Sequence, residues 1–318
     1  MSKRFSPAGA EFVSPARECW VLSGKRRESR PGRYLITLVL ILLCAASSHA
    51  QSRADCSVIK SEILKRNVPY CVVLPPSFAT DKTRHFPVLY YLHGLGDNEQ
   101  SLINGGGWSE YDDLLRQKKI GEFILAAPAG NQTFFINSRD GRVLYEDFFL
   151  GEFMPAIEKK YRAGEQRSQR ALVGISMGGF GALHLGFAHP NLFISTAGIM
   201  PALIEKLPAS FGSDAEEQLM KRVFGDASDT AYYDRVSVFT FAERRPVGNF
   251  KGLKIYFATG NGDDYNFEFG ATALHKVLER RGIPHEYHID PGRHSMQFAL
   301  PHFGAALEFT SKAFGLTK

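Results

Sequence analysis

Cysteine is scarce in this 318-residue chain, which contains four and no CxxC pair. No Cys/His cluster has the spacing that holds zinc, so no metal is expected. Cys19 and Cys44 fall in the first 50 residues, which leaves Cys56 and Cys71 as the remaining pair. The two flank "SVIKSEILKRNVPY", a stretch typical of a two-stranded hairpin. In an oxidising compartment they would form a disulfide, and the alternative is two buried free thiols.

An excess of one charge is also missing from most of the chain. The whole sequence has 38 Lys and Arg against 33 Asp and Glu, but the first 50 residues hold eight and three of these, which leaves 30 of each. The basic pI of 8.9 therefore comes from the N-terminal segment. A neutral remainder lacks the basic surface that nucleic acid requires, so no nucleic-acid partner is expected.

The N-terminal segment contains one uncharged apolar run, "LITLVLILLCAA", at residues 35–46. A bilayer span needs about 20 apolar residues, whereas a signal-peptide core has roughly 7 to 15. Ser48 and Ala50 then supply the small residues that precede a cleavage site. We expect residues 1–50 to be a signal peptide and leader, the mature protein to be secreted or periplasmic, and no stable membrane anchor after cleavage. The alternative is an uncleaved anchor.

Neither internal repeats nor low-complexity tracts occur in residues 51–318, where apolar runs alternate with helical patterns. Runs such as "FPVLYYLHG", "EFILAAPAG", "RALVGI" and "KIYFATG" are apolar throughout, which is typical of parallel strands buried on both faces. The pattern predicts the α/β class, with a mostly parallel central sheet, helices on both faces and an N-terminal antiparallel hairpin. Residues 201–250 are too long for an ordinary crossover and are predicted to form an excursion over one edge.

The motif "GISMG" places Ser176 between Gly174 and Gly178, after a predicted strand and before a predicted helix. Glycines two positions before and after remove Cβ atoms that would clash in a tight turn between the strand and the helix. The turn would expose the Ser176 hydroxyl at the carboxyl end of the sheet. The alternative is a glycine-rich helix start that merely packs closely on the sheet.

A serine nucleophile needs a histidine base and a carboxylate that orients it, in the chain order Ser, acid, His. His294 in "DPGRHSM" follows a predicted strand in a Pro and Gly loop, whereas His184, His189 and His275 fall on or at the end of predicted helices. The sequence "YFATGNGDDYN" supplies the acid directly after a strand. At this level the acid is either Asp263 or Asp264.

Acyl transfer also needs two hydrogen-bond donors for the oxyanion that forms on the substrate carbonyl. The backbone N–H of Met177, which follows the nucleophile, is expected to be one. The loop "HGLGD" after an earlier predicted strand supplies the second, with the Leu95 amide as the candidate. The alternative is that this loop is only a glycine turn.

Several stretches together resemble one family. In chain order they are "YYLHGLGD", "GGGWSEY", "FFINSRDGRVLYEDFF", "FMPAIEKKYR", "GISMGGFGAL", "PNLF" and "DPGRH". They are similar to the esterase family of the α/β-hydrolase superfamily that includes esterase D (S-formylglutathione hydrolase), feruloyl esterases and antigen 85 mycolyltransferases. The resemblance covers roughly residues 56–312 and implies an α/β-hydrolase fold for residues 51–318.

The resemblance implies a catalytic triad of Ser176, Asp263 and His294. The family places its acid three residues after the glycine that ends the strand, and counting from Gly260 gives Asp263. The chain departs from feruloyl esterases in having "PGRH" where a Gly usually precedes the His, and in lacking an aromatic residue two positions after it. These departures concern the substrate more than the chemistry.

The expected activity is that of an exported serine carboxylic-ester hydrolase, acting through an acyl-enzyme on a small or sugar-linked ester and needing no cofactor. One alternative is an acyltransferase of the mycolyltransferase type, in which a sugar hydroxyl replaces water. Another is a non-catalytic binding protein on a hydrolase scaffold. The sequence does not predict the oligomeric state.

Substrate contacts are expected from one histidine and from aromatic residues, several of them in residues 201–250. The candidates are His93, Trp108, Tyr232 and Tyr233, with Phe211 and Phe224 as further wall residues. The alternative for the aromatic residues is that they belong to the ordinary core.

Overall fold

The computed structural model describes residues 51–210 and 212–317, so the predicted leader and Phe211 lie outside the described residues. Eight strands form one sheet in the order β1-β2-β4-β3-β5-β6-β7-β8. Their bounds are β1 Arg53–Ser61, β2 Arg66–Leu74, β3 Val88–Leu92, β4 Ile124–Pro128, β5 Arg170–Ile175, β6 Ser195–Ile199, β7 Lys254–Gly260 and β8 Glu286–Asp290.

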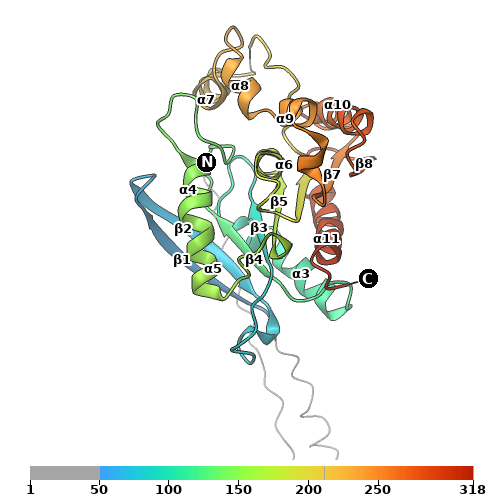
Figure 1. The fold of residues 1–318 in the computed structure, drawn as a ribbon. Coiled ribbons are helices and arrows are strands. Elements are labelled where there is room, and N and C mark those ends of the chain that lie inside the picture. The colour runs from blue at the N-terminus through green and yellow to red at the C-terminus, as the bar shows by residue number, and fades with distance from the viewer. Residues whose placement is uncertain (1–50, 211, 318) are drawn as a thin grey trace, which may run out of the picture. The chain divides into compact units, whose positions relative to one another are not determined.

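The sheet is parallel from β4 through β8, and only its N-terminal edge is antiparallel. β1 pairs with β2, and β2 with β4, in antiparallel register, whereas all five remaining pairs are parallel. This is the α/β-hydrolase arrangement with an N-terminal hairpin, and it confirms the predicted fold class. Because parallel strands run the same way, the loops after β3, β5, β7 and β8 all leave from one edge of the sheet (Figure 1).

Helices cover both faces of the sheet (Figure 1). Their bounds are α2 Ser101–Asn104, α3 Gly107–Arg116, α4 Tyr145–Phe148, α5 Met154–Tyr161, α6 Met177–Ala188, α7 Asp214–Phe224, α8 Ala231–Val236, α9 Val238–Arg244, α10 Phe267–Arg280 and α11 Met296–Ala313. α3 and α11 pack with strand side chains of one face, and α4 to α6 and α8 to α10 pack on the other. Side chains of β3 alternate between these cores, Val88 and Tyr90 into one and Leu89 and Tyr91 into the other. This alternation explains why the strands are apolar throughout.

The predicted excursion forms α7, α8 and α9, which connect the neighbouring strands β6 and β7. Because this connection starts at the carboxyl end of β6, it passes the edge where the other loops leave. Within the described residues, no helix has both the length and the apolar composition needed to cross a bilayer.

The N-terminal hairpin is closed by a disulfide between Cys56 and Cys71, which lie opposite each other in the β1–β2 register. Cys71 is fully buried in the sheet. The two cysteines are 15 residues apart in sequence, and the bond between them encloses the turn of the hairpin. It confirms the predicted pairing and is compatible with an oxidising compartment.

A partly buried carboxylate links the helix that follows Ser176 to two other segments. Glu146 in α4 accepts hydrogen bonds from His184 Nε2 at 2.9 Å and from His189 Nε2 at 2.6 Å. His184 Nδ1 lies 2.7 Å from the carbonyl oxygen of Val236 in α8. Burial alone would raise the pKa of Glu146, but the two histidine hydrogen bonds outweigh burial and hold that pKa well below its ordinary value. The network therefore joins α4, α6 and α8 through an ionised carboxylate.

Breaking the disulfide should destabilise the protein. Loop-entropy estimates for a ring of about 15 residues give roughly 3 kcal/mol, although measured values scatter. We expect reductant, or the double substitution Cys56→Ser and Cys71→Ser, to lower the melting temperature measured by calorimetry. Reductant should have no further effect on the double variant, and two free thiols in alkylated native protein would refute the bond.

The Glu146 network should also stabilise the fold. A depressed pKa in the folded state means that the carboxylate adds stability above the ordinary Glu pKa of about 4.3 and loses it as the pH falls below that value. We expect Glu146→Gln to lower the free energy of unfolding by about 2 kcal/mol near neutral pH, the value of a hydrogen bond to a charged group. The difference in the free energy of unfolding between this variant and wild type, measured by urea titration, should become smaller below about pH 4. Glu243→Gln, which removes a more exposed carboxylate paired with Arg280, is the matched control.

Candidate active site

Ser176 lies on a strained turn between β5 and α6. Its φ of 55° and ψ of −115° are unusual for a residue with a side chain, and such strain is typical of functional turns. A Cβ at Gly174 would lie 2.0 Å from the carbonyl oxygen of Gly178, and one at Gly178 would lie 2.0 Å from that of Leu92 in β3. Only glycine therefore fits at these two positions, which explains the spacing in the motif.

The structure brings Ser176, His294 and Asp263 into direct contact. His294 Nε2 lies 2.9 Å from Ser176 Oγ, and His294 Nδ1 lies 2.7 Å from Asp263 Oδ2. Because an ionised carboxylate can only accept, Nδ1 carries the proton and Nε2 is free to accept from the serine hydroxyl. The Asp263 side chain is fully buried and that of His294 is 12% exposed. This is the arrangement in which a serine hydroxyl can be deprotonated as it attacks a carbonyl.

Asp264, the alternative acid, does not contact the imidazole of His294 through its carboxylate. Its carboxylate instead accepts hydrogen bonds from the Arg293 side chain and from the His294 backbone N–H. The adjacent aspartates point in different directions, as successive residues leaving a strand must.

The two candidate oxyanion donors lie beside Ser176. Met177 is the first residue of α6, so its N–H has no partner within the helix. Leu95 lies in the loop after β3, and a Cβ on the neighbouring Gly94 would be 3.8 Å from Ser176 Cβ. Leu95 and Met177 line the same cavity as Ser176. Their positions are those expected of two donors on one side of the serine.

A cavity of about 1090 Å³ opens over Ser176 and His294. Its apolar lining includes Ile175, Met200, Leu203, Leu219 and Met220 from β5, the segment after β6 and α7. Charged and polar residues line other parts of it: Asp97, Glu205, Lys206, Glu216 and Asn266. The cavity therefore offers a ligand both apolar and polar walls.

His93, predicted to contact substrate, is not among the residues that line this cavity. The residue is buried, its Nδ1–H donates to the carbonyl oxygen of Gly94 at 2.8 Å, and its Nε2 accepts from the Gly130 N–H at 2.8 Å. Burial lowers the pKa of His93, which agrees with a neutral ring that donates at one nitrogen and accepts at the other. His93 fixes the loop that carries Leu95.

The described aromatic residues predicted as pocket walls do not line this cavity either, and their side chains pack elsewhere. The Trp108 indole N–H donates to Ser52 Oγ, and the ring packs with the α3 and α11 core. Tyr232 donates its hydroxyl to the Asn137 carbonyl oxygen. Tyr233 is buried and donates to the carbonyl oxygen of Ile204, and Phe224 packs edge-on against it. Burial and a partner for each polar tip account for these positions.

Of the described aromatic residues that line the cavity, three follow Asp264 and the other is Phe134. Tyr265, Phe267 and Phe269 all line the cavity. The Tyr265 ring packs edge-on against His294, with centroids 4.9 Å apart, and stacks on Phe267 at 5.4 Å. Tyr265 and Phe269 are 60% and 69% exposed. The signal in the sequence was "DDYNFEF", in which three aromatic residues follow the acid.

The fold and the serine–histidine–aspartate contact define an α/β hydrolase. The chain belongs to the family described as "Putative esterase", which it matches over residues 61–309. It is 25% identical to an acetyl esterase of Caldicellulosiruptor saccharolyticus over 264 residues, 79% of this chain and 96% of the relative. Membership in this family places the protein among ester hydrolases.

Solved structures share the fold. A ferulic acid esterase superposes with a TM-score of 0.74 at 24% identity, covering 83% of this chain and 99% of that one. An S-formylglutathione hydrolase from Agrobacterium tumefaciens gives a TM-score of 0.67 at 19% identity, covering 85% and 98%. These similarities confirm the α/β-hydrolase fold.

Filling the space at Gly178 should disrupt the turn. In Gly178→Ala the added methyl group must displace the β3 backbone at Leu92, and overpacking of this kind costs about 1 to 3 kcal/mol. We expect a lower melting temperature and a loss of ester hydrolysis that exceeds the loss of folded protein. Gly248→Ala is the control, because a Cβ there meets nothing within 4 Å and its φ is not positive. If the two variants had the same melting temperature and the same activity, the close approach of Gly178 to the Leu92 backbone would be contradicted.

Proposed function

We propose that the protein is a serine carboxylic-ester hydrolase that acts through an acyl-enzyme on Ser176. The observation that carries this proposal is the unbroken contact from Ser176 Oγ through the His294 imidazole to Asp263 at the floor of a cavity. Family membership supports the same class of reaction.

In the proposed mechanism Ser176 Oγ attacks the ester carbonyl while its proton passes to His294 Nε2. The Met177 and Leu95 N–H groups donate to the oxyanion of the tetrahedral intermediate. The bond to the alcohol breaks as His294 returns the proton to the leaving oxygen. Water then attacks the acyl-enzyme by the same route and releases the acid.

Asp263 fixes the tautomer of His294 and stabilises the imidazolium during each proton transfer. Its side chain is excluded from solvent, so water does not screen the interaction between the two charges. The remaining oxygen of the carboxylate accepts the Tyr265 N–H at 2.9 Å, which holds the carboxylate in orientation. No cofactor enters this mechanism.

The cavity supports either a small ester or an acylated sugar as substrate. Apolar side chains lie near Ser176, and exposed aromatic rings lie near His294, where the alcohol leaves. The relatives named as acetyl esterase and ferulic acid esterase act on esters of this kind, which agrees with the proposal.

We also propose that the protein acts outside the cytoplasm after removal of residues 1–50. The hairpin disulfide supports export, because such bonds persist in oxidising compartments. N-terminal sequencing of protein recovered from the producing cell would test this, with a start near Gln51 expected and an intact N-terminus counting against it.

Replacing Ser176 with Ala should abolish turnover. Loss of the nucleophile in a serine hydrolase costs on the order of 10⁵-fold or more in kcat, and removal of one cavity-facing hydroxyl should leave the melting temperature nearly unchanged. We would measure p-nitrophenol release from p-nitrophenyl acetate, including the pre-steady-state burst. Ser168→Ala, an exposed serine just before β5, is the control.

Retained burst and turnover in Ser176→Ala would refute the serine mechanism. A wild-type protein that binds esters without turnover would favour a binding protein on this scaffold. Product analysis with a sugar acceptor present separates hydrolysis from acyl transfer, because transfer yields a new ester in place of the free acid. A panel of esters, varied first in the acid and then in the alcohol, would define the substrate.

A further inference from the structure

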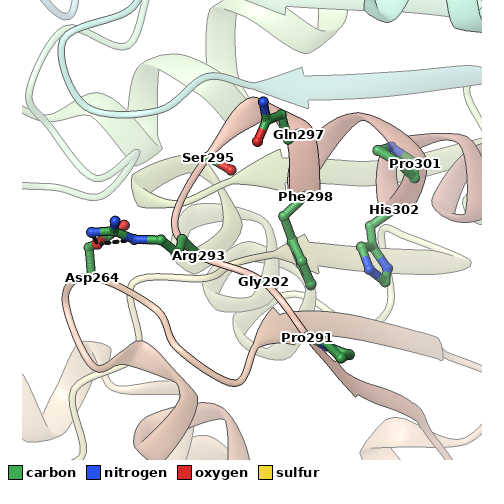
Figure 2. Close-up of a pocket in the computed structure, with 9 residues that line it drawn as sticks. All are labelled: Asp264, Pro291, Gly292, Arg293, Ser295, Gln297, Phe298, Pro301 and His302. Carbon is green, nitrogen blue, oxygen red and sulfur yellow. Dashed lines mark hydrogen bonds and ion pairs between the residues drawn. The ribbon is translucent and has the colours of Figure 1, made fainter.

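Asp264 holds the loop that carries His294. Its Oδ1 accepts from Arg293 Nε at 2.8 Å and also from Nη2 of the same guanidinium. Its Oδ2 accepts from the backbone N–H of His294 at 3.2 Å. Figure 2 shows the Asp264 and Arg293 side chains meeting end to end. One carboxylate thus contacts a side chain and a backbone group on consecutive residues of the loop.

The loop has little packing on one side. A hollow of about 620 Å³ adjoins it, and His294 is not part of the hollow's lining (Figure 2). The lining residues are Asp264, Pro291, Gly292, Arg293, Ser295, Gln297, Phe298, Pro301 and His302. The Arg293 side chain is 78% exposed. Hydrogen bonds therefore have to fix the position of the loop on this side.

Backbone hydrogen bonds between this loop and the acid loop extend only to Gly292, although within the loop the Ser295 N–H donates to the carbonyl oxygen of Arg293 at 2.9 Å. The Asn261 N–H donates to the carbonyl oxygen of Asp290 at 2.9 Å, and the Gly262 N–H donates to that of Gly292 at 3.0 Å. These bonds continue the β7–β8 pairing as far as Gly292. For the next two residues, Arg293 and His294, the contacts to the acid loop come from the side chains of Asp263 and Asp264.

We propose that Asp264, together with Arg293, is a positioning residue that sets the backbone of His294 so that its imidazole reaches Asp263 and Ser176 at once. This inference rests on the proposed function. A displacement of about 1 Å in a catalytic group can cost 10²-fold in rate. Without Asp264, the His294 backbone N–H would lose its acceptor and the imidazole would have only its side-chain contacts to hold it.

The positioning role of Asp264 can be distinguished from a contribution to fold stability. Hydrogen bonding to Arg293 lowers the pKa of Asp264, so the carboxylate stays ionised near neutral pH. Exposed ion pairs contribute little to the free energy of unfolding. A positioning role therefore predicts a loss of kcat without a matching loss of stability, whereas a merely structural role predicts that both fall together.

The test compares variants of the full-length protein at a temperature well below their unfolding transitions. Asp264→Ala should lower kcat about 10- to 100-fold, with KM within about threefold of wild type, and should slow labelling of Ser176 by a fluorophosphonate by a similar factor. Asp264→Asn, which keeps one acceptor oxygen for the His294 N–H, should recover part of the loss. Arg293→Gln should lower kcat less than Asp264→Ala does. Adding Arg293→Gln to Asp264→Ala should lower kcat little further, because the effects of substitutions at two interacting residues do not add.

Glu243→Ala serves as the matched control, since it breaks another arginine–carboxylate pair between exposed side chains, away from the cavity. It should leave kcat, KM and labelling unchanged. The Asp263→Asn variant should lose about four orders of magnitude in kcat, as expected for the residue that orients the base.

A kcat for Asp264→Ala within twofold of wild type would overturn the positioning role. So would a loss of kcat matched by unfolding at the assay temperature. If Asp264→Asn were crippled while Asp263→Asn was nearly normal, Asp264 would be the triad acid and the proposal would be wrong. In each case Ser176→Ala reports separately on the proposed function, because its inactivity does not depend on Asp264.

Discussion

The site depends on one geometric constraint, the alignment of parallel strands that end at a common edge. Leu92 ends β3, Ile175 ends β5, and Gly260 and Asp290 end β7 and β8. Each is followed by a loop that carries one residue of the candidate site: Leu95, Ser176, Asp263 or His294. Residues far apart in sequence, such as Ser176 and His294, therefore meet without a long unsupported loop. Since the register is fixed by hydrogen bonds inside a core buried on both faces, the distances between these groups are fixed with it.

Two polar groups close to the core near Ser176 are each held by more than one hydrogen-bond partner. His93, buried beneath the Leu95 loop, uses both ring nitrogens. Glu146 is shared by His184 and His189 on the helix that follows Ser176. A buried polar group without a partner is costly, whereas a fully bonded network adds rigidity. These hydrogen bonds fix the segments that surround Ser176. The surrounding structure therefore holds the strained turn in its conformation.

The sequence indicates the candidate serine, histidine and aspartate residues more clearly than it indicates the residues of the cavity wall. A nucleophile elbow requires glycines at fixed spacing, and a triad requires fixed residue types after strands, so the sequence led to Ser176, His294 and the adjacent aspartates that the structure brings together. Which aspartate faces the imidazole depends on one backbone turn, and only the structure shows the contact at Asp263. The sequence does not distinguish aromatic residues of the core from those of the cavity wall, because a large apolar ring packs equally well in either place. Trp108 and Tyr233 carry no mark that separates these outcomes.

The contact among Ser176, His294 and Asp263 and much of the cavity wall are formed by different segments of the chain. Ser176, His294 and Asp263 stand on loops anchored directly to the sheet, whereas much of the cavity wall comes from residues 200–220 and from the aromatic segment after Asp264. Side chains in this wall can change size or polarity without altering the strand ends, because the excursion joins the sheet only at β6 and β7. The exceptions are Tyr265 and Phe267, whose rings both pack edge-on against His294. A side-chain change at either residue would therefore alter the packing of His294 as well as the cavity wall.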